Sequence, residues 1–395
     1  MISLRNITLL LASTLMIMSG AAIAPALPAI GQAFADVQGA DFWVHQVLTL
    51  TGLSVALAAP LLGRFVDGSD PRHLLILSLA VAGVSGSAIF FYPDSLVLLI
   101  GSRLLLGIAV AGVMLAFTLL IANYFQGGEL DKFLGLQAGV GAYSAVAYLA
   151  IGGMLAEVHW SWAFLLFLLP LFLVLPAWFS LDAVSAVAPP KGQANNAEAT
   201  SWTLIGLYIL GLLEAVFFYW VLVHVPFHLE ANLALTASGS GFAIAGMMLS
   251  NAVVAGYYPQ IRGERSHALV QGIAYFSLAL GLSLFAIGGV VMLMLGLFFM
   301  GSAFGLMRPN IMRWLLTVVS PAARGKAVGL FTSAFFIGQF LSAPLAEPVI
   351  AAAGRSVAFA FAAIVVAVLG VGLVLLNAYQ ARIPVNEPLT SQADS

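Results

Sequence analysis

The sequence contains no cysteine and few charged residues. Asp, Glu, Lys and Arg together make up 8% of its 395 residues. The lack of cysteine excludes disulfides, thiol nucleophiles and cysteine-ligated metals. Soluble domains carry roughly 25% charged residues, so a chain with 62% hydrophobic residues has too little polar surface to cover a fold in water. We therefore expect most of the chain to lie in a lipid bilayer.

Signatures of several other protein classes are also missing. The net charge of −2 does not suggest a nucleic-acid partner. The sequence shows no phosphate-binding loop, no Walker-type lysine and no catalytic triad, and the charges inside its apolar stretches are isolated. We expect neither an enzyme nor an ATP-driven pump, and no cofactor. The energy for any transport would then come from an ion gradient, with the proton as the natural ion.

Twelve apolar stretches are each long enough to cross the bilayer, which requires about 20 residues. The first stretch resembles a secretory signal, but it continues through Ala24-Pro25-Ala26-Leu27-Pro28 and more spans follow, so we interpret it as a retained span. The predicted fold is an all-α polytopic membrane protein of twelve helices in two six-helix halves. The stretches are 7–27, 42–62, 74–92, 96–120, 133–154, 162–181, 203–225, 238–258, 268–287, 289–312, 327–349 and 357–377.

The distribution of Lys and Arg predicts the orientation of the spans. If both termini are cytoplasmic, only Arg355 falls in an external loop, as the positive-inside rule favours. The predicted location is the bacterial cytoplasmic (inner) membrane, with the protein as a multi-pass monomer. Eleven basic residues fall in the cytoplasmic segments: Arg5, Arg64, Arg72, Lys132, Lys191, Arg262, Arg265, Arg313, Arg324, Lys326 and Arg382.

A polar, Ala- and Pro-rich segment divides the spans into two sets of six. Residues 1–181 form the predicted N-terminal bundle, 182–202 a flexible cytoplasmic linker, 203–377 the C-terminal bundle and 378–395 a cytoplasmic tail. A weak internal repeat supports this division, because the loop that starts at Gly63 is echoed by the loop that starts at Gly256. Parallel repeats of this kind place a substrate site near the midplane, between the halves.

Several motifs resemble those of the major facilitator superfamily, most of all its twelve-span drug:proton antiporters. The first loop motif matches at Gly63, Asp67 and Arg72, and the fourth stretch carries Arg103 with Gly107 four residues later. The region from Gly305 through Pro309-Asn310 to Arg324-Gly325 is also similar. The resemblance covers nearly the whole chain and implies a transporter that works by alternating access. It also implies that Gly63, Asp67 and Arg72 form a cytoplasmic gate loop, although these charges can instead serve only to fix the topology.

Two departures from the antiporter pattern bear on the direction of transport. The fifth stretch has Tyr148-Leu149 where antiporters usually have Gly-Pro, although Gly152-Gly153 is kept. The first stretch also lacks the acidic residue that many drug antiporters carry. An importer on the same fold therefore stays open as an alternative to an exporter.

Glu214 is the leading candidate for proton coupling. It lies about 16 Å from either end of the predicted seventh span, at 1.5 Å per residue, and is interpreted as the only carboxylate deep inside any span. An acid at this depth costs on the order of 2.5–3.5 kcal/mol to insert and usually has a function. The alternative is a permanently protonated Glu214 that hydrogen-bonds across a helix interface.

Two intramembrane arginines are further candidates. Arg103 is expected about 10 Å from the external end of the fourth span, where it can support proton coupling electrostatically or instead bind backbone carbonyls. Arg308 precedes Pro309, so it either satisfies a carbonyl freed by the proline or lines the substrate cavity. If both arginines reach the cavity, the substrate is an anion or a zwitterion, such as a carboxylate siderophore.

Aromatic and histidine residues complete the predicted site. Besides Glu214 and Arg308, the predicted cavity contains Phe217, Phe218, Tyr219, His224 and Tyr148. His45, His224 and His228 can titrate near neutral pH, but their spacing predicts no metal site. The glycines at 135, 139, 141, 152 and 153 are expected to allow close helix packing.

These observations favour a proton-coupled exporter of a small organic compound, either drug-like or siderophore-like. A proton symporter or importer of a small metabolite is the nearest alternative. A non-transporting membrane scaffold is a third reading, which would not need a central acid such as Glu214.

Overall fold

The computed structural model describes residues 3–65, 70–126, 128–183, 202–320 and 323–380, and within these ranges all regular structure is helical. In the part of the chain that the structure describes, eleven helices or helix runs are long and apolar enough to cross a membrane. The pair α4 (Ala40–Gln46) and α5 (Thr49–Phe65), which meet at a bend of 59°, passes the same test when it is counted as one span and then gives a twelfth. The predicted fold class is confirmed: the chain is an all-α, multi-pass membrane protein.

The first half of the chain folds into six spans. The first span is broken into four short helices. Pro25 and Pro28 interrupt the regular backbone bonding around η1 and the start of α3. The helices of this half, besides α4 and α5, are α1 (Leu4–Ser13), α2 (Leu15–Ala21), η1 (Ala24–Ala26), α3 (Leu27–Ala33), α6 (Pro71–Phe91), α7 (Leu96–Tyr124), α8 (Gly128–Val158), η2 (Trp160–Phe167) and α9 (Leu168–Ser180).

The second half repeats this pattern with longer, less interrupted helices. Prolines at 226, 309, 344 and 348 lie inside helices, as membrane helices tolerate where neighbours satisfy the freed backbone groups. The helices are α10 (Trp202–Leu233), α11 (Ala237–Gly256), α12 (Tyr258–Arg262), α13 (His267–Ile287), α14 (Val290–Val318), α15 (Arg324–Ala353) and α16 (Arg355–Gln380).

The twelve predicted apolar stretches all fall on observed spans, but most of the helices are longer than predicted. The seventh stretch was expected to end at residue 225, whereas α10 continues to Leu233. The linker between 184 and 201 and the tail from 381 lie outside the described residues, so the boundaries 182–202 and 378–395 stay predictions.

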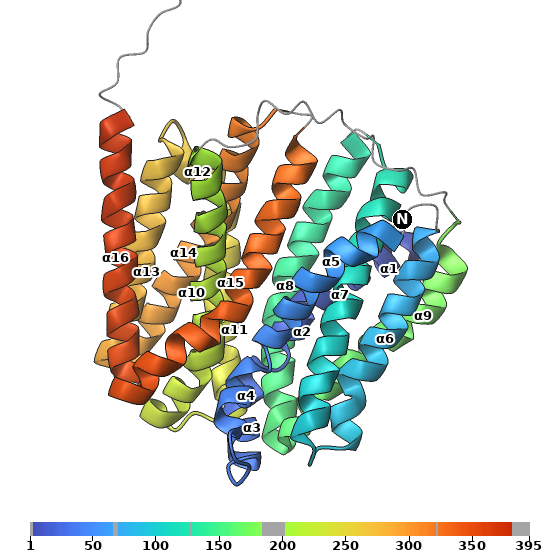
Figure 1. Cartoon of the computed structure of the whole chain (residues 1–395), viewed down its shortest axis with the longest axis horizontal. Helices are drawn as coiled ribbons and strands as arrows, with labels where there is room; N and C mark the ends of the chain where they lie inside the picture. The colour runs from blue at the N-terminus through green and yellow to red at the C-terminus, as the bar shows by residue number, and fades with distance from the viewer. Residues whose placement is uncertain (1–2, 66–69, 127, 184–201, 321–322, 381–395) are drawn as a thin grey trace, which may run out of the picture.

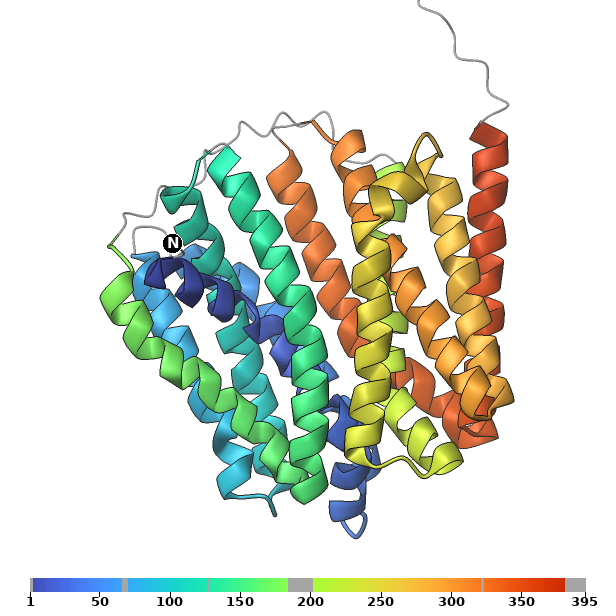
Figure 2. The same cartoon turned by 180° about the vertical axis from the view of Figure 1, so that it is seen from behind.

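The two halves stand side by side (Figures 1 and 2). Contact between them runs mainly along two helix pairs: α8 packs against α11, and α5 packs against α15. Four helices, α5, α8, α11 and α15, therefore frame the boundary on which a two-half transporter would build its path.

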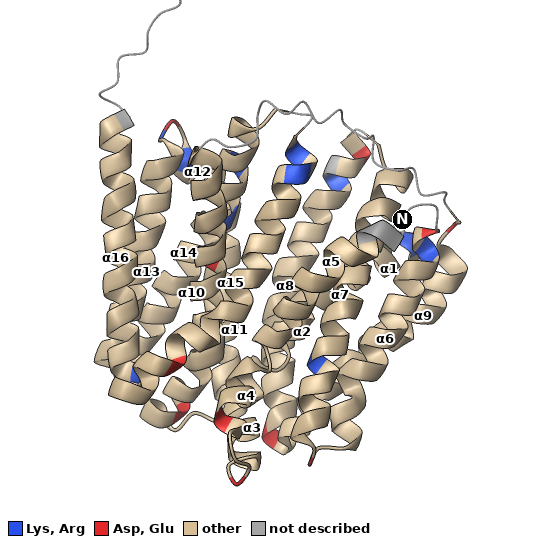
Figure 3. Cartoon of the chain, viewed as in Figure 1, with Lys and Arg blue, Asp and Glu red and all other residues tan. Residues whose placement is uncertain are grey.

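Charged residues distinguish the two ends of the bundle (Figure 3). Most Lys and Arg gather at the end where α6, α8, α13 and α15 begin, which we call the basic end. We call the other end, where α3, α4 and the start of α16 lie, the acidic end. The predicted asymmetry of basic residues is thus present in space as well as in sequence.

The halves touch closely toward the acidic end. The Nε2 of Gln339 on α15 donates to the carbonyl of Leu48, 3.1 Å away in the other half. The Nε2 of Gln32 on α3 donates to Oε1 of Glu230 on α10 at 2.8 Å. These bonds join residues far apart in sequence and hold the two bundles together at this end.

Some of the glycines predicted to allow close helix packing lie against a neighbouring backbone, and others do not. A Cβ built on Gly152 would lie 2.1 Å from the carbonyl oxygen of Ala22, and one on Gly153 would lie 2.6 Å from that of Ala237 in the other half. At Gly135 and Gly139, nearer the basic end of α8, a Cβ would meet nothing within 4 Å. The packing prediction is therefore confirmed for Gly152 and Gly153 and wrong for Gly135 and Gly139.

Candidate functional site

Glu214 and Arg308 form an ion pair inside the C-terminal half. The Nε of Arg308 on α14 lies 2.9 Å from Oε1 of Glu214 on α10. The Glu214 side chain is only 5% exposed, whereas the Arg308 side chain is 41% exposed. The second carboxylate oxygen of Glu214, Oε2, has no hydrogen-bond partner among the described residues. The pair thus joins a buried acid to a guanidinium that reaches the surface.

Aromatic rings hold the Arg308 guanidinium on its other side. Its carbon Cζ lies 3.8 Å from the ring centroid of Phe335 and 5.8 Å from that of Phe331, both on α15. A cation over an aromatic face is attracted by the ring quadrupole. Arg308 is therefore held by two aromatic rings of α15 as well as by Glu214.

The pair lies well inside the bundle. Glu214 is twelve residues from the basic end of α10, or about 18 Å at 1.5 Å per residue. Arg308 is ten residues from the basic end of α14, or about 15 Å. Because α10 is longer than predicted, Glu214 lies nearer the basic end than the acidic end.

Tyr219 connects this pair to the other half of the molecule. Its ring packs edge-on against Phe335, with the centroids 6.2 Å apart. A Cβ added at Gly20 on α2 would lie 3.7 Å from its ring. Tyr219 therefore lies between Phe335, the ring that contacts Arg308, and the first span of the N-terminal half.

Two other aromatics of the predicted cavity pack within the helices around them. Phe218 meets Phe304 of α14 edge-on at 5.1 Å between centroids. Phe217 stacks on Trp220 of its own helix at 6.5 Å. Both residues lie on α10 close to Glu214 in sequence, whereas the rings that contact the Arg308 guanidinium are Phe331 and Phe335.

Arg103 is buried in the N-terminal half, away from the ion pair. Its Nη2 donates to the carbonyl of Gly86 at 3.1 Å, and its guanidinium lies 4.9 Å from the rings of Phe164 and Phe167. Among the described residues none of its contacts is with Glu214. This arrangement corresponds to the alternative in which Arg103 binds backbone carbonyls, and it ties α7 to α6 and η2.

Tyr148 also makes its polar contact inside the N-terminal half. Its hydroxyl lies 2.7 Å from the Thr14 hydroxyl, which links α8 to the first span. The side chain is buried. The residue that replaces the antiporter motif thus serves as a bridge between two helices of one half.

The predicted gate loop is only partly described. Gly63 lies in the last turns of α5, and Asp67 lies outside the described residues. Arg72 begins α6, hydrogen-bonds the carbonyl of Trp178 on α9 and lies 5.3 Å from its ring. Its described contacts are therefore within the N-terminal half.

The histidines lie on the acidic side of the bundle, and one carboxylate near them was missed. Glu347 lies inside α15 near the acidic end of that helix, and the sequence analysis did not single it out. His45 lies 3.1 Å from Glu347 through Nδ1, and its ring is 5.2 Å from that of His224. His228 instead bonds the carbonyl of Phe285 at 3.0 Å. The charge in the apolar run before Pro348 was the signal for Glu347.

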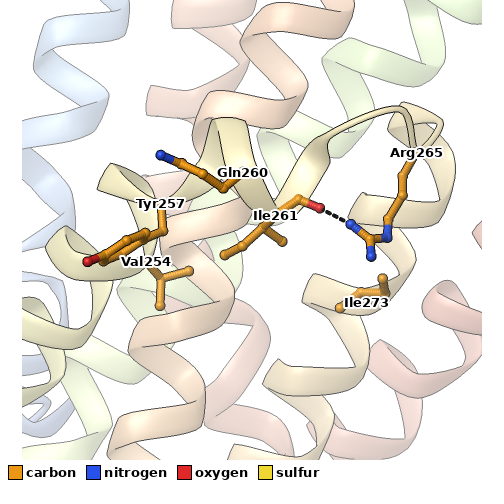
Figure 4. A pocket seen from close by; sticks show the side chains of 6 residues that line it. All are labelled: Val254, Tyr257, Gln260, Ile261, Arg265 and Ile273. Carbon is orange, nitrogen blue, oxygen red and sulfur yellow. Dashed lines mark hydrogen bonds between the residues drawn. The ribbon is translucent and has the colours of Figure 1, made fainter.

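A separate open hollow of about 590 Å³ lies at the basic end, between the end of α11, α12 and α13 (Figure 4). Val254, Tyr257, Gln260, Ile261, Arg265 and Ile273 line it. Arg265 donates to the carbonyl of Ile261 at 2.5 Å. None of the residues around Glu214 contributes to this hollow.

Parts of the chain resemble curated fungal transporters. A 188-residue stretch is 26% identical to a phomenoic acid biosynthesis cluster MFS-type transporter of Leptosphaeria maculans and covers 47% of this chain. A 143-residue stretch is 28% identical to the MFS-type transporter ppz2 of Metarhizium majus and covers 36% of this chain. The chain spans about a quarter of the length of these relatives, 28% and 24%.

Solved structures resemble the fold over nearly its whole length. The nucleoside transporter NupG (D323A mutant) superposes with a TM-score of 0.75 at 14% identity, covering 95% of this chain and 99% of that one. The human organic anion transporter MFSD10 (TETRAN) gives 0.67 at 18% identity, covering 94% and 99%. The Major Facilitator Superfamily family model matches residues 9–288, which is more than half of the chain. The chain belongs to the Major Facilitator Superfamily.

Proposed function

We propose that the chain is a secondary active transporter that exports a small organic zwitterion in exchange for protons. The observation that carries this proposal is the Glu214–Arg308 pair, a buried acid bound to a half-exposed guanidinium. The basic end is assigned to the cytoplasm by the positive-inside rule. The membrane is taken to be a bacterial cytoplasmic membrane and the working unit a monomer.

The chemistry of the pair follows from which group changes charge. Arginine stays protonated, so only Glu214 can take up or release the proton. When Glu214 is protonated its ion pair is lost, and the Arg308 guanidinium can bind a carboxylate of the substrate instead. Phe331 and Phe335 keep the guanidinium in place during this exchange.

The direction of coupling depends on the charge of the substrate. A zwitterion would bind Arg308 through its carboxylate and the Glu214 carboxylate through its ammonium group, so a proton on Glu214 competes with it. Competition between proton and substrate for one site gives antiport. In this reading the halves rock around the site, and only one of the two ligands is carried in each direction.

A simple anion gives the opposite coupling, and this is the second candidate function. Such a substrate binds Arg308 best when Glu214 is protonated, because the free carboxylate would both occupy the guanidinium and repel the anion. Proton and anion then travel together, as in a symporter or importer. Because Glu214 is paired with a positively charged Arg308, this site favours an anion over a lipophilic cation as the substrate.

The test is transport by purified protein in liposomes with an imposed pH gradient. Three probes separate the readings: a carboxylate siderophore, a zwitterionic amino-acid-like compound and a lipophilic cation. We expect proton movement coupled to the anion or the zwitterion, and its loss in Glu214→Gln. Arg313→Gln, on the same helix as Arg308 and exposed, is the matched control for Arg308→Gln.

Two results would refute the proposal. Transport of the lipophilic cation alone would exclude an anion-binding role for Arg308. Equal gradient-driven flux in the wild type and Glu214→Gln would exclude Glu214 as the proton carrier.

A further inference from the structure

Three side chains that could ligate a metal meet at the boundary between the two halves. His45 lies on α4 of the N-terminal half, while His224 on α10 and Glu347 on α15 belong to the C-terminal half. One donor atom of each lies within 4.8 Å of the others. The proposed function does not involve these three residues as a group. They are far apart in the sequence, so their positions do not indicate the cluster.

Three of the four ring nitrogens of this cluster have no hydrogen-bond partner among the described residues. His45 Nδ1 lies 2.8 Å from the carbonyl of Asp41, so this nitrogen carries the hydrogen and Nε2 keeps its lone pair. His45 Nε2 and both ring nitrogens of His224 have no hydrogen-bond partner among the described residues. Both histidines are buried, at 1% and 0% exposure. Buried polar atoms without partners cost free energy, which a bound ligand would recover.

A ring nitrogen that bonds a backbone carbonyl is the usual support of a metal-binding histidine. Such a bond fixes the tautomer and aims the other nitrogen at the metal. The bond from His45 Nδ1 to Asp41 is of this kind. Two imidazoles and one carboxylate form the ligand set of zinc sites that keep a fourth position open.

We propose that His45, His224 and Glu347 bind a divalent transition metal, with zinc as the best fit, and that the ion links the two halves at the acidic end. Donor atoms on one tetrahedral zinc lie about 3.4 Å apart, given bonds near 2.1 Å. The 4.8 Å limit on the present separations exceeds this by about 1.4 Å. Binding of the ion would draw the three donor atoms together by up to this amount.

The surroundings provide both a route and an opposing charge. The Glu347 side chain is 19% exposed and Asp41 is 85% exposed, so carboxylates lead from the surface to the histidines. Arg355 lies 5.0 Å from the ring of Phe227 and interacts electrostatically with His224 and Glu347. Its positive charge weakens the binding of a cation, which predicts that removing it tightens the site.

The test is titration of tag-free, full-length protein in detergent with Zn²⁺, in competition with a chromophoric chelator. We expect one Zn²⁺ per chain, and affinity at least roughly tenfold lower in His45→Gln, His224→Gln and Glu347→Gln, since even outer partners of a metal site change affinity 10–100-fold. Arg355→Gln is expected to bind more tightly than the wild type. Co²⁺ in place of Zn²⁺ should give the visible bands of a four-coordinate nitrogen and oxygen site.

His228→Gln is the matched control, because His228 is also buried on α10 but bonds Phe285 rather than the cluster. It should bind Zn²⁺ like the wild type. Glu347→Gln keeps the shape of the side chain at a partly exposed position, so it remains informative if a histidine variant fails to fold. No stoichiometric binding by the wild type, or unchanged affinity in folded Glu347→Gln, would overturn the proposal.

Discussion

At the scale of single residues, the Glu214–Arg308 pair has to be explained as a unit. Two charges inside a membrane protein are costly, and removing one of a buried pair leaves the other uncompensated. Cation–π contacts stabilise the arginine of the pair. Oε2 of Glu214, in contrast, has no hydrogen-bond partner among the described residues. Such an incomplete arrangement suits a site that exchanges partners better than one that only holds helices together.

Neutralising both members of the pair should lower the stability by less than the sum of the losses in the two single variants. We expect Glu214→Gln and Arg308→Gln each to lower the thermal midpoint in detergent. The double variant should regain a coupling energy of about 0.5–3 kcal/mol, typical of residues in direct contact. Strictly additive losses would mean that the two side chains do not form an ion pair.

Transport separates this structural effect from the functional one. The double variant is expected to recover stability without recovering gradient-driven flux, because neither proton carrier nor anion site remains. Arg313→Gln should change neither quantity, since Arg313 is exposed on the same helix. Recovery of flux in the double variant would assign the pair a purely structural role.

The sequence identified Glu214 and Arg308 separately but could not pair them. They are 94 residues apart (308 − 214), on α10 and α14, and hydropathy gives no information on how two helices are rotated. The same limit applies to His45, His224 and Glu347, which come from three helices. Arg103 shows the converse: a motif resemblance predicted coupling, whereas its described contacts are with a carbonyl and two rings of its own half.

At the scale of helices, the apolar stretches predicted the number of spans because a fixed bilayer thickness sets their length. The details within a span could not be predicted in this way. The bend between α4 and α5 has no proline at the break, and α10 continues past His224 to Leu233. Backbone bonding and tertiary packing, rather than hydropathy, decide where such helices bend and end.

Glycine substitutions on α8 test the packing that the structure describes. In Gly152→Ala the new methyl group would lie 2.1 Å from the carbonyl oxygen of Ala22. A backbone atom cannot move aside cheaply, so a loss of about 1–3 kcal/mol is expected, as for other overpacked sites. The measurement is the thermal midpoint of the purified variant.

Gly139→Ala is the control on the same helix. Its methyl group would meet nothing within 4 Å, and alanine in a helix is favoured over glycine by about 1 kcal/mol. The stability should therefore stay equal or rise. A similar loss in both variants would mean that contact with Ala22 does not account for the effect at Gly152.

At the scale of the whole molecule, the two ends of the bundle are expected to face different compartments. The natural absence of cysteine makes this directly measurable, because each introduced thiol is the only one. Val37→Cys lies in the exposed loop between α3 and α4 at the acidic end, and Gln126→Cys precedes α8 at the basic end. In intact cells a membrane-impermeant maleimide should label Val37→Cys, and it should label Gln126→Cys only after permeabilisation. The reverse pattern would invert the proposed orientation.

The joint between the halves at the acidic end gives the last prediction. Two hydrogen bonds, Gln339 to Leu48 and Gln32 to Glu230, already join the halves there, and zinc across His45, His224 and Glu347 would add a third link. A ligand shifts a conformational equilibrium only if it binds one state better than the other. When the halves part at this end, His45 separates from the other two ligands, so zinc would hold the joint closed and slow the cycle.

Zinc added at the acidic face of proteoliposomes should therefore reduce substrate flux, and a chelator added to the same face should restore it. Zinc confined to the basic face should have no effect, because the ligands lie at the other end. In His45→Gln the remaining flux should become insensitive to zinc, whereas in His228→Gln it should respond as in the wild type. If zinc binds stoichiometrically but leaves flux unchanged from either face, the three residues bind the ion without closing the joint, and the halves open without separating His45 from α10 and α15.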